Sequence, residues 1–242
     1  MLLRRITKHV KEQNWFAVGI DFVIVVIGVF IGIQVANWNE LQTERERLDT
    51  QLDSFRTELI MARDDLASLE AYALERAGDA SALRRRLSGD GPELDEEDFN
   101  RLSMSALRAT SFTVIYRNFD ELSLSGGLSQ LEDESLRDLI SRWDTQLSNI
   151  RTTDATSEDF RAANVVPAFA STVVFGNSFK TDDRYENFTE TDRFDFDVQS
   201  VRQNLEFDNA LSLRQVLAVQ QALLIVDFHN ISEELIAALD EI

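Results

Sequence analysis

The sequence predicts an all-α protein: one N-terminal transmembrane helix, followed by an extended, exported helical bundle with a long coiled-coil-like first helix. Three observations lead to this prediction. An apolar segment of membrane-spanning length lies near the N-terminus, a seven-residue apolar repeat follows it at once, and short breaks then separate further segments of helical periodicity. The predicted regions are residues 1–14, a basic cytoplasmic tail, residues 15–38, the span, and residues 39–242, the exported bundle.

The segment from Trp15 to Trp38 carries a single charged side chain, that of Asp21. A bilayer core about 30 Å thick needs about 20 apolar helical residues, and tryptophans suit both of its interfaces. A buried helix of a soluble protein and a cleaved signal peptide are the alternatives. The segment is longer than the apolar core of a signal peptide, about 7–15 residues, and no small-residue cleavage site follows it. We therefore expect an uncleaved signal anchor with Trp15 and Trp38 as interfacial anchors in the lipid bilayer.

The distribution of charge predicts the orientation of the span. Four basic side chains and one acidic side chain precede it, whereas residues 39–242 carry 20 basic and 41 acidic side chains. Because basic flanks are retained in the cytoplasm, we expect the N-terminus to be cytoplasmic and the bundle to be exported.

Apolar residues recur at two heptad positions from Leu41 to Leu87. Of 14 such positions, 12 are apolar, and Arg45 and Arg76 are the exceptions. A repeat of this length predicts a coiled-coil or bundle seam on a helix about 70 Å long, continuous with the span. The seam can be buried within one chain or against a second copy. Its length and its start at the membrane favour a homodimer or a higher oligomer.

Breaks and capping residues divide the following stretch. After the break at Ser88–Pro92 we expect a helix that starts at Pro92, has Asp95–Asp98 near its positive end and carries an apolar face over Phe99–Leu107. A short helix is expected next, ending at glycines 126 and 127, with three apolar residues on one side: Ile115, Phe119 and Leu122. Residues 113–116 are a possible strand without a pairing partner.

Two longer helices are expected in the C-terminal half. The first starts at residues 132–134 and has an apolar face formed by Leu136, Leu139, Ile140, Trp143, Leu147 and Ile150. Pro167 is expected to interrupt the next segment, and Gly176–Val198 is interpreted as an acidic loop that docks its aromatic side chains on the bundle. The last helix, Leu205–Ile242, should pack antiparallel to the first, through a repeat formed by Leu217, Leu224, Ile231 and Ala238 and broadened by Val216, Leu223, Phe228 and Leu235.

Composition excludes several classes of protein. The 242 residues include 24 Lys and Arg against 43 Asp and Glu, a net charge of −19, with no Cys and two His. Nucleic-acid binding needs clustered basic side chains, and zinc, iron–sulfur and thiol sites need Cys or several His. The chain also lacks a nucleophile elbow and a phosphate-binding glycine-rich loop. We therefore predict no enzyme activity, no cofactor and no nucleic-acid partner.

Three polar features are possible sites, and each has a simpler interpretation. The acidic residues Asp192, Asp195 and Asp197 lack the spacing of a calcium-binding loop, so a solvated loop is favoured. His229 lies near the apolar stripe of the last helix and is interpreted as a core or boundary histidine. Arg84–Arg86 is interpreted as a solvated face that pairs with acidic side chains of neighbouring helices, and a docking patch for an acidic partner is the alternative.

Two stretches carry residues that match known motifs. In VVIGVFIGIQVANWNE, Val25–Glu40, the matching residues are Gln34, Asn37, Trp38, Asn39 and Glu40. In Phe119–Trp143 they are Glu121, Leu122, Ser125, Gly126, Leu136 and Arg137, with Ile140 in place of the motif's final Leu. Both stretches resemble a large family of uncharacterised bacterial single-pass membrane proteins. The resemblance implies a helical, membrane-anchored domain of unknown function, and it implies no chemistry. With the orientation that the charges predict, we expect the anchor in the bacterial inner membrane and the bundle in the periplasm.

Asp21 shares one face of the span with Gly28 and Gly32, which lie within about 20° of it on a helix of 3.6 residues per turn. Because the Gly-x-x-x-Gly spacing allows helices to approach closely, we expect this face to pack against another helix. The alternatives are that Asp21 reaches headgroup water, or that it carries a proton.

We expect a non-enzymatic protein that presents its helical surface to an envelope partner or to a second copy of itself. A ligand-sensing bundle is one alternative, although residues 1–14 hold no output domain. A single-span subunit of an ion-coupled, stator-like membrane complex is the other, with Asp21 as the titrating group.

Overall fold

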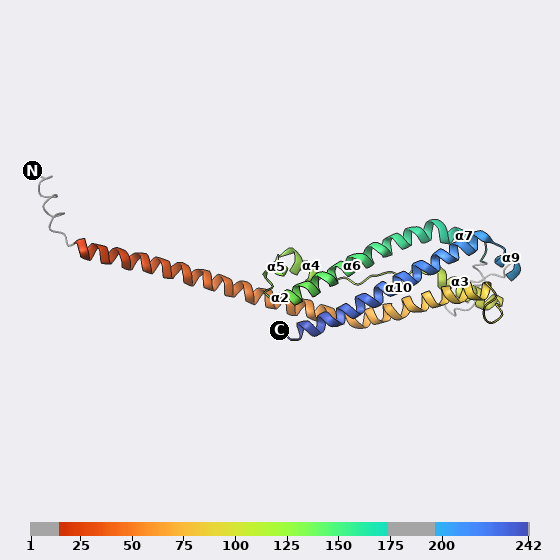
Figure 1. The fold of residues 1–242 in the computed structure, drawn as a ribbon, viewed down its shortest axis with the longest axis horizontal. Coiled ribbons are helices and arrows are strands. Elements are labelled where there is room, and N and C mark those ends of the chain that lie inside the picture. Colours follow the sequence, from red (N-terminus) through yellow and green to blue (C-terminus); the bar gives the residue numbers. More distant parts are fainter. Residues whose placement is uncertain (1–14, 174–196, 242) are drawn as a thin grey trace, which may run out of the picture. The chain divides into compact units, whose positions relative to one another are not determined.

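The computed structural model describes residues 15–173 and 197–241, and all regular secondary structure in these ranges is helical (Figure 1), which confirms the predicted all-α class. The predicted tail 1–14 and most of the predicted loop 176–198 lie outside the described residues. In chain order the elements are α2 (Trp15–Leu87), α3 (Glu96–Leu107), α4 (Arg117–Leu124), α5 (Gly127–Gln130), α6 (Glu134–Phe160), the π-helix η1 (Arg161–Val165), α7 (Val166–Ala170), α9 (Val198–Arg202) and α10 (Leu205–Leu239).

The chain divides within α2 into two compact units, Met1–Leu52 and Asp53–Ile242. In the first unit every described side chain from Val18 to Arg47 is exposed. The single helix of 73 residues confirms that the apolar segment and the heptad repeat lie on one helix.

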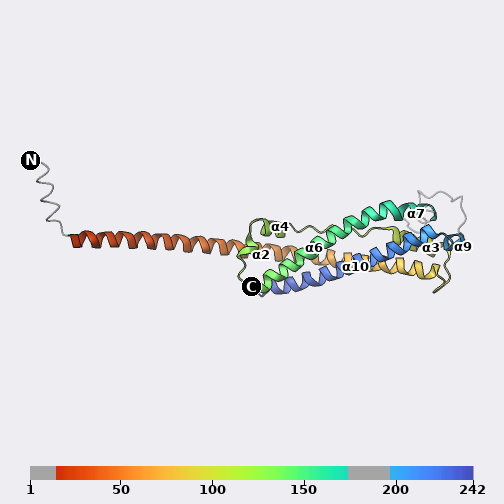
Figure 2. The same ribbon diagram turned by 45° about the horizontal axis from the view of Figure 1, so that its top comes forward.

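Three long helices lie side by side in the second unit: α2 from Asp53 onward, α6 and α10 (Figures 1 and 2). The Arg63 Nε donates to Glu233 over 2.7 Å and the Arg84 Nη1 donates to Gln215 over 3.0 Å, so α10 runs antiparallel to α2, as predicted. The Trp143 indole N–H donates to the Ser232 hydroxyl over 2.9 Å and ties α6 to α10.

Within this unit the predicted heptad seam is buried inside a single chain. Its members Phe55, Leu59, Ala62, Leu66, Ala73, Ala80 and Leu83 are all buried. Leu41, predicted to lie on the same seam, is 56% exposed. Asp240, at the C-terminal end of α10, pairs with Arg56 of α2, so α10 ends close to the start of the second unit.

The heptad phase predicted for α10 is wrong by one residue. Its buried positions include Leu211, Ala218, Ile225 and Leu239, one residue on from the predicted repeat. Of the four residues predicted to broaden the core face, Phe228 and Leu235 are fully buried, whereas Val216 and Leu223 are 60% and 57% exposed. The helix is apolar on both faces, so apolar periodicity alone does not distinguish the two phases.

The bundle has two apolar cores. One is aromatic and surrounds Trp143, whose ring lies 4.8 Å from Tyr116, 4.9 Å from Phe119 and 5.3 Å from Phe55, all close to edge-to-face. The other lies where α3, α7 and α9 pack near the start of α10, and it includes Phe99, Phe169, Phe207 and Leu211.

The segments around α3 and α4 correct three local predictions. Helix α3 begins at Glu96 rather than Pro92, because the Asp95 side chain caps it by accepting from the Asp98 N–H over 2.8 Å. Ile115 is 64% exposed and precedes α4, and residues 113–116 are not a strand but part of an irregular connector, residues 108–116. The N-terminus of α4 is held by Glu58 of α2, whose carboxylate accepts from the N–H groups of residues 117–119.

Pro167 does not interrupt the helix that precedes it. The chain continues from α6 through a π turn, in which the Val166 N–H bonds to the Arg161 carbonyl five residues earlier, and α7 comes next. Proline is tolerated there because the first turn of a helix does not need its N–H.

Candidate functional site

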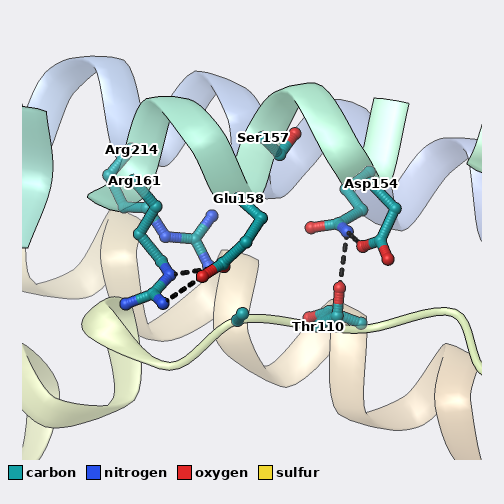
Figure 3. Close-up of a pocket in the computed structure, with 8 residues that line it drawn as sticks. Thr110, Asp154, Ser157, Glu158, Arg161 and Arg214 are labelled. Atoms are coloured by element: carbon teal, nitrogen blue, oxygen red, sulfur yellow. Dashed lines mark hydrogen bonds and ion pairs between the residues drawn. The ribbon is translucent and has the colours of Figure 1, made fainter. Parts of the chain in front are cut away.

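A polar layer lies where α6 and α10 face the connector that follows α3 (Figure 3). It is formed by Thr110 in the connector, Asp154 and Ser157 on α6, and Arg214 and Gln221 on α10, with Glu158 and Arg161 beside it. Four of these side chains, those of Thr110, Ser157, Arg214 and Gln221, belong to buried residues. Buried polar side chains in a helical bundle need partners, so the layer is the first candidate for a functional site.

Arg214 is only 3% exposed and binds backbone rather than a ligand. Its Nε donates to the Ala106 carbonyl over 2.7 Å, and its Nη2 donates to the Arg108 carbonyl over 2.9 Å. Burial lowers the pKa of Arg214, and the nearby Arg161 lowers it further, whereas the charge of Glu158 acts in the opposite direction. The guanidinium therefore caps the C-terminal end of α3 from within the bundle.

Asp154 and Gln221 hold the connector that follows α3. The Gln221 side-chain amide donates to the Thr110 carbonyl over 2.6 Å and to the Asp154 Oδ1 over 2.7 Å. The Phe112 N–H donates to the Asp154 Oδ2 over 3.2 Å. Burial raises the pKa of Asp154, although these hydrogen bonds favour the ionised form.

The π turn places Arg161 against Glu158 at the edge of the layer. The Arg161 Nε donates to the Glu158 Oε2 over 2.8 Å, and this pair lowers the pKa of Glu158 and raises that of Arg161. Because Glu158 is largely exposed, the pair contributes little to stability.

The geometry suits holding a segment better than binding a substrate. The space between the side chains is about 10 Å³, which admits about one water molecule. The Ser157 hydroxyl is buried without a hydrogen-bond partner and faces the same small space. Within the described ranges, no group of three or more His, Asp or Glu side chains is arranged to hold a metal ion.

We expect the stability contributed by Asp154 to fall as pH rises. Its pKa in the folded state is raised above the unfolded value, so the folded state binds more protons between the two values. Between pH 4 and 8, the unfolding free energy of the wild type should decline relative to that of Asp154→Asn. The slope should correspond to a difference of at most one bound proton between the folded and unfolded states. The exposed Asp144→Asn is the matched control and should leave the slope unchanged. A wild-type slope of the opposite sign would show that the hydrogen bonds outweigh burial.

The predicted residues of the span all lie on α2. Asp21, Gly28 and Gly32 are exposed, and a Cβ built on either glycine meets nothing within 4 Å. Trp15 is the first residue of the helix and Trp38 is 67% exposed. The motif residues Gln34, Asn37, Asn39 and Glu40 are exposed on the same helix.

The residues of the central motif form the corner between α4 and α6. Leu122 and Leu136 are buried, and the Arg137 guanidinium donates to the Leu131 carbonyl. Gly126 is the N-cap of α5 and has a φ of 77°, a left-handed conformation that favours glycine. Glu121 and Ser125 instead line an open hollow on the surface together with Arg117, Asp120 and Leu124.

Other predicted features have structural partners. His229 lies at the core boundary, with its Nδ1 against the Glu70 carboxylate of α2. Arg86 pairs with Asp98 over 2.7 Å, as expected of a face that contacts acidic side chains. Asp197 is a helix cap that accepts from the Gln199 N–H over 2.9 Å, and Asp192 and Asp195 lie outside the described residues.

Sequence reasoning missed the polar layer entirely. The signal that reveals it is the phase of α10: Arg214 and Gln221 follow Phe207 at intervals of seven residues, on the buried face. A charged residue and an amide at core positions indicate a partner elsewhere in the chain.

No protein-family profile, curated protein or solved structure matches the chain. The resemblance to uncharacterised bacterial membrane proteins therefore stays a prediction that depends on the motif residues themselves.

Proposed function

We propose that the chain is a non-enzymatic, single-pass membrane protein of the bacterial inner membrane. In this proposal residues 15–38 cross the bilayer with the N-terminus in the cytoplasm. The helical unit that begins at Asp53 lies in the periplasm and presents its surface to an envelope partner or to a second copy.

The contrast between α2 and α10 supports the proposal. Both helices contain segments that are long and apolar enough to cross a membrane. None of the residues in the apolar window of α2 is buried within the chain, whereas 39% of the corresponding window of α10 is buried. An exposed run of this length is stable only in an apolar surrounding, since a soluble protein leaves no apolar patch of this size uncovered.

The polar layer supports a structural role for the bundle. Its buried donors bind the chain's own carbonyls, and the space between them admits about one water molecule. A surface that is held rigid from inside is suited to protein–protein contact.

Paired arginine substitutions in the two apolar helices test the proposal. The variant with Ile27→Arg and Ile31→Arg should leave the membrane fraction, because each Arg near the middle of a span raises the insertion free energy by about 2.5–3.5 kcal/mol. The matched variant with Val216→Arg and Leu223→Arg in α10 should stay in the membrane fraction. All four side chains are more than half exposed, so neither pair disturbs a packed core. The proposal fails if the α2 variant stays and the α10 variant leaves.

Protease added to intact spheroplasts tests the orientation of the wild type. The unit from Asp53 onward should be degraded, while the span remains in the membrane. A protected bundle would place it in the cytoplasm.

A further inference from the structure

The outward face of α10 carries an apolar stripe that no described part of the chain covers. Leu213, Val216, Val219 and Leu223 are 50%, 60%, 38% and 57% exposed. Val216 follows the buried Arg214 by two residues, and Leu223 follows the buried Gln221 by two residues. Two residues correspond to about 200° around the helix, so Val216 and Leu223 lie on the side opposite the buried face. We call these four residues, together with the exposed Gln220, the outer stripe.

The outer stripe is uncharged in a strongly acidic protein. Between Asp208 and Asp227 the helix has one charged side chain, that of Arg214, and Arg214 is buried. The whole chain has a net charge of −19, so two copies repel each other over most of their surface. They can approach closely where the surface has no charge, and the outer stripe is such a place.

The seam on α2, which the sequence favoured for dimerisation, is occupied within the chain. Phe55, Leu59 and Leu66 of this seam are at most 2% exposed. A second copy therefore needs another apolar surface, and α10 provides one at helical spacing.

We propose that the outer stripe of α10 pairs with the same stripe of a second copy, with the two α10 helices parallel about a two-fold axis that runs along them. This inference depends on the proposed membrane anchoring, which inserts both copies in the same orientation. In this parallel arrangement each residue of the stripe lies near its own counterpart, because the axis runs along both helices. Gln220 then meets Gln220 of the other copy, and side-chain amides satisfy each other because each is both donor and acceptor. A reversed pairing centred on residue 218 would instead place Gln220 against Val216 and leave the amide unpaired.

The size of the outer stripe matches association in a membrane better than association in solution. A stable interface between soluble proteins uses about 20–30 residues on each side, and the outer stripe has far fewer. Anchoring two chains in one bilayer confines both to the same membrane, and this raises the effective concentration of each chain for the other. The bundle alone should therefore associate weakly, and the anchored chain should pair.

Single-cysteine cross-linking of the full chain in membranes tests the pairing, since the wild type has no cysteine to interfere. Val216→Cys and Leu223→Cys should each form a disulfide with their own counterpart, on the order of tenfold more than Ser148→Cys on the exposed side of α6. Disulfides found only when Leu213→Cys and Leu223→Cys copies are mixed would show a reversed pairing and overturn the proposal. Cross-linking at the background level in a chain that remains in the membrane would also overturn it.

A charge variant gives an independent readout. Val216→Lys combined with Leu223→Lys should weaken pairing by about 100-fold, measured by energy transfer between labelled copies in vesicles, with an unchanged melting temperature because both side chains are exposed. Unchanged pairing would overturn the proposal. Loss of the wild type from the membrane fraction is a different result, and it would mean that the anchoring itself fails.

Discussion

Leu59→Asp should unfold the helical bundle or leave it barely stable. Leu59 lies on the buried seam of α2 and is 2% exposed, so the new carboxylate would be buried among apolar side chains. A substitution of this kind costs about 4–5 kcal/mol, which is a large part of the stability of an ordinary domain. We expect the melting temperature of the full chain, followed by circular dichroism at 222 nm, to fall by about 10–20 °C or more.

Leu41→Asp is the matched control for this prediction. Leu41 lies on the same predicted seam of the same helix, at the other of its two heptad positions, and is 56% exposed. The same change of residue there should leave the melting temperature within a degree or two of the wild type, about the effect of an ordinary surface substitution. Equal destabilisation by both substitutions would mean that the seam is also buried on the N-terminal side of Leu48, and that a surface outside this chain covers it there.

Local pattern predicts those helices well whose apolar residues occupy a single face. On α6 the six apolar positions from Leu136 to Ile150 are all buried, and the residues between them are mostly exposed. Its start is determined by Asp133, which caps the helix by accepting from the N–H groups of Ser135 and Leu136. One apolar stripe and one cap determine both the register and the boundary.

The same reasoning fails on α10 because two faces are apolar. The pairs Val216 and Leu217, and Leu223 and Leu224, supply apolar residues to either phase. The correct phase contains Arg214 and Gln221. A rule that places only apolar residues in the core rejects this phase because of these two residues. Tertiary partners reverse that rule here, because both side chains are satisfied by connector carbonyls more than 100 residues away in sequence.

The connector itself has no signature in local sequence. Residues 108–116 look strand-like in part, yet the structure gives them no neighbouring strand among the described residues, and their backbone is bound by side chains of α6 and α10. The polar layer and the connector therefore specify each other: the connector offers unpaired carbonyls and N–H groups, and the bundle offers buried donors and acceptors. Neither half can be recognised without the other.

Arg214→Met should be the most damaging change within the polar layer. Methionine keeps the length of the stem but removes the donors to the Ala106 and Arg108 carbonyls, which then lie without partners beside α10. Each unsatisfied carbonyl costs about 1–3 kcal/mol, and relief of the buried charge offsets part of this. We expect a loss of about 2–4 kcal/mol in unfolding free energy, together with faster hydrogen exchange at Phe112, whose N–H is bonded to Asp154 in the same layer.

Comparison with Arg85→Met and Gln221→Leu distinguishes this role of Arg214 from a general effect of charge. Arg85 is exposed on α2, so its replacement should change stability by less than about 0.5 kcal/mol. Gln221 holds the same connector, and once either side chain is lost the connector can move away from α10. The double variant Arg214→Met with Gln221→Leu should therefore lose less than the two single losses added together. Strict additivity would mean that the two side chains act on separate segments. An Arg214→Met variant as stable as the wild type would mean that the free-energy cost of burying the guanidinium equals the stabilisation from its two hydrogen bonds.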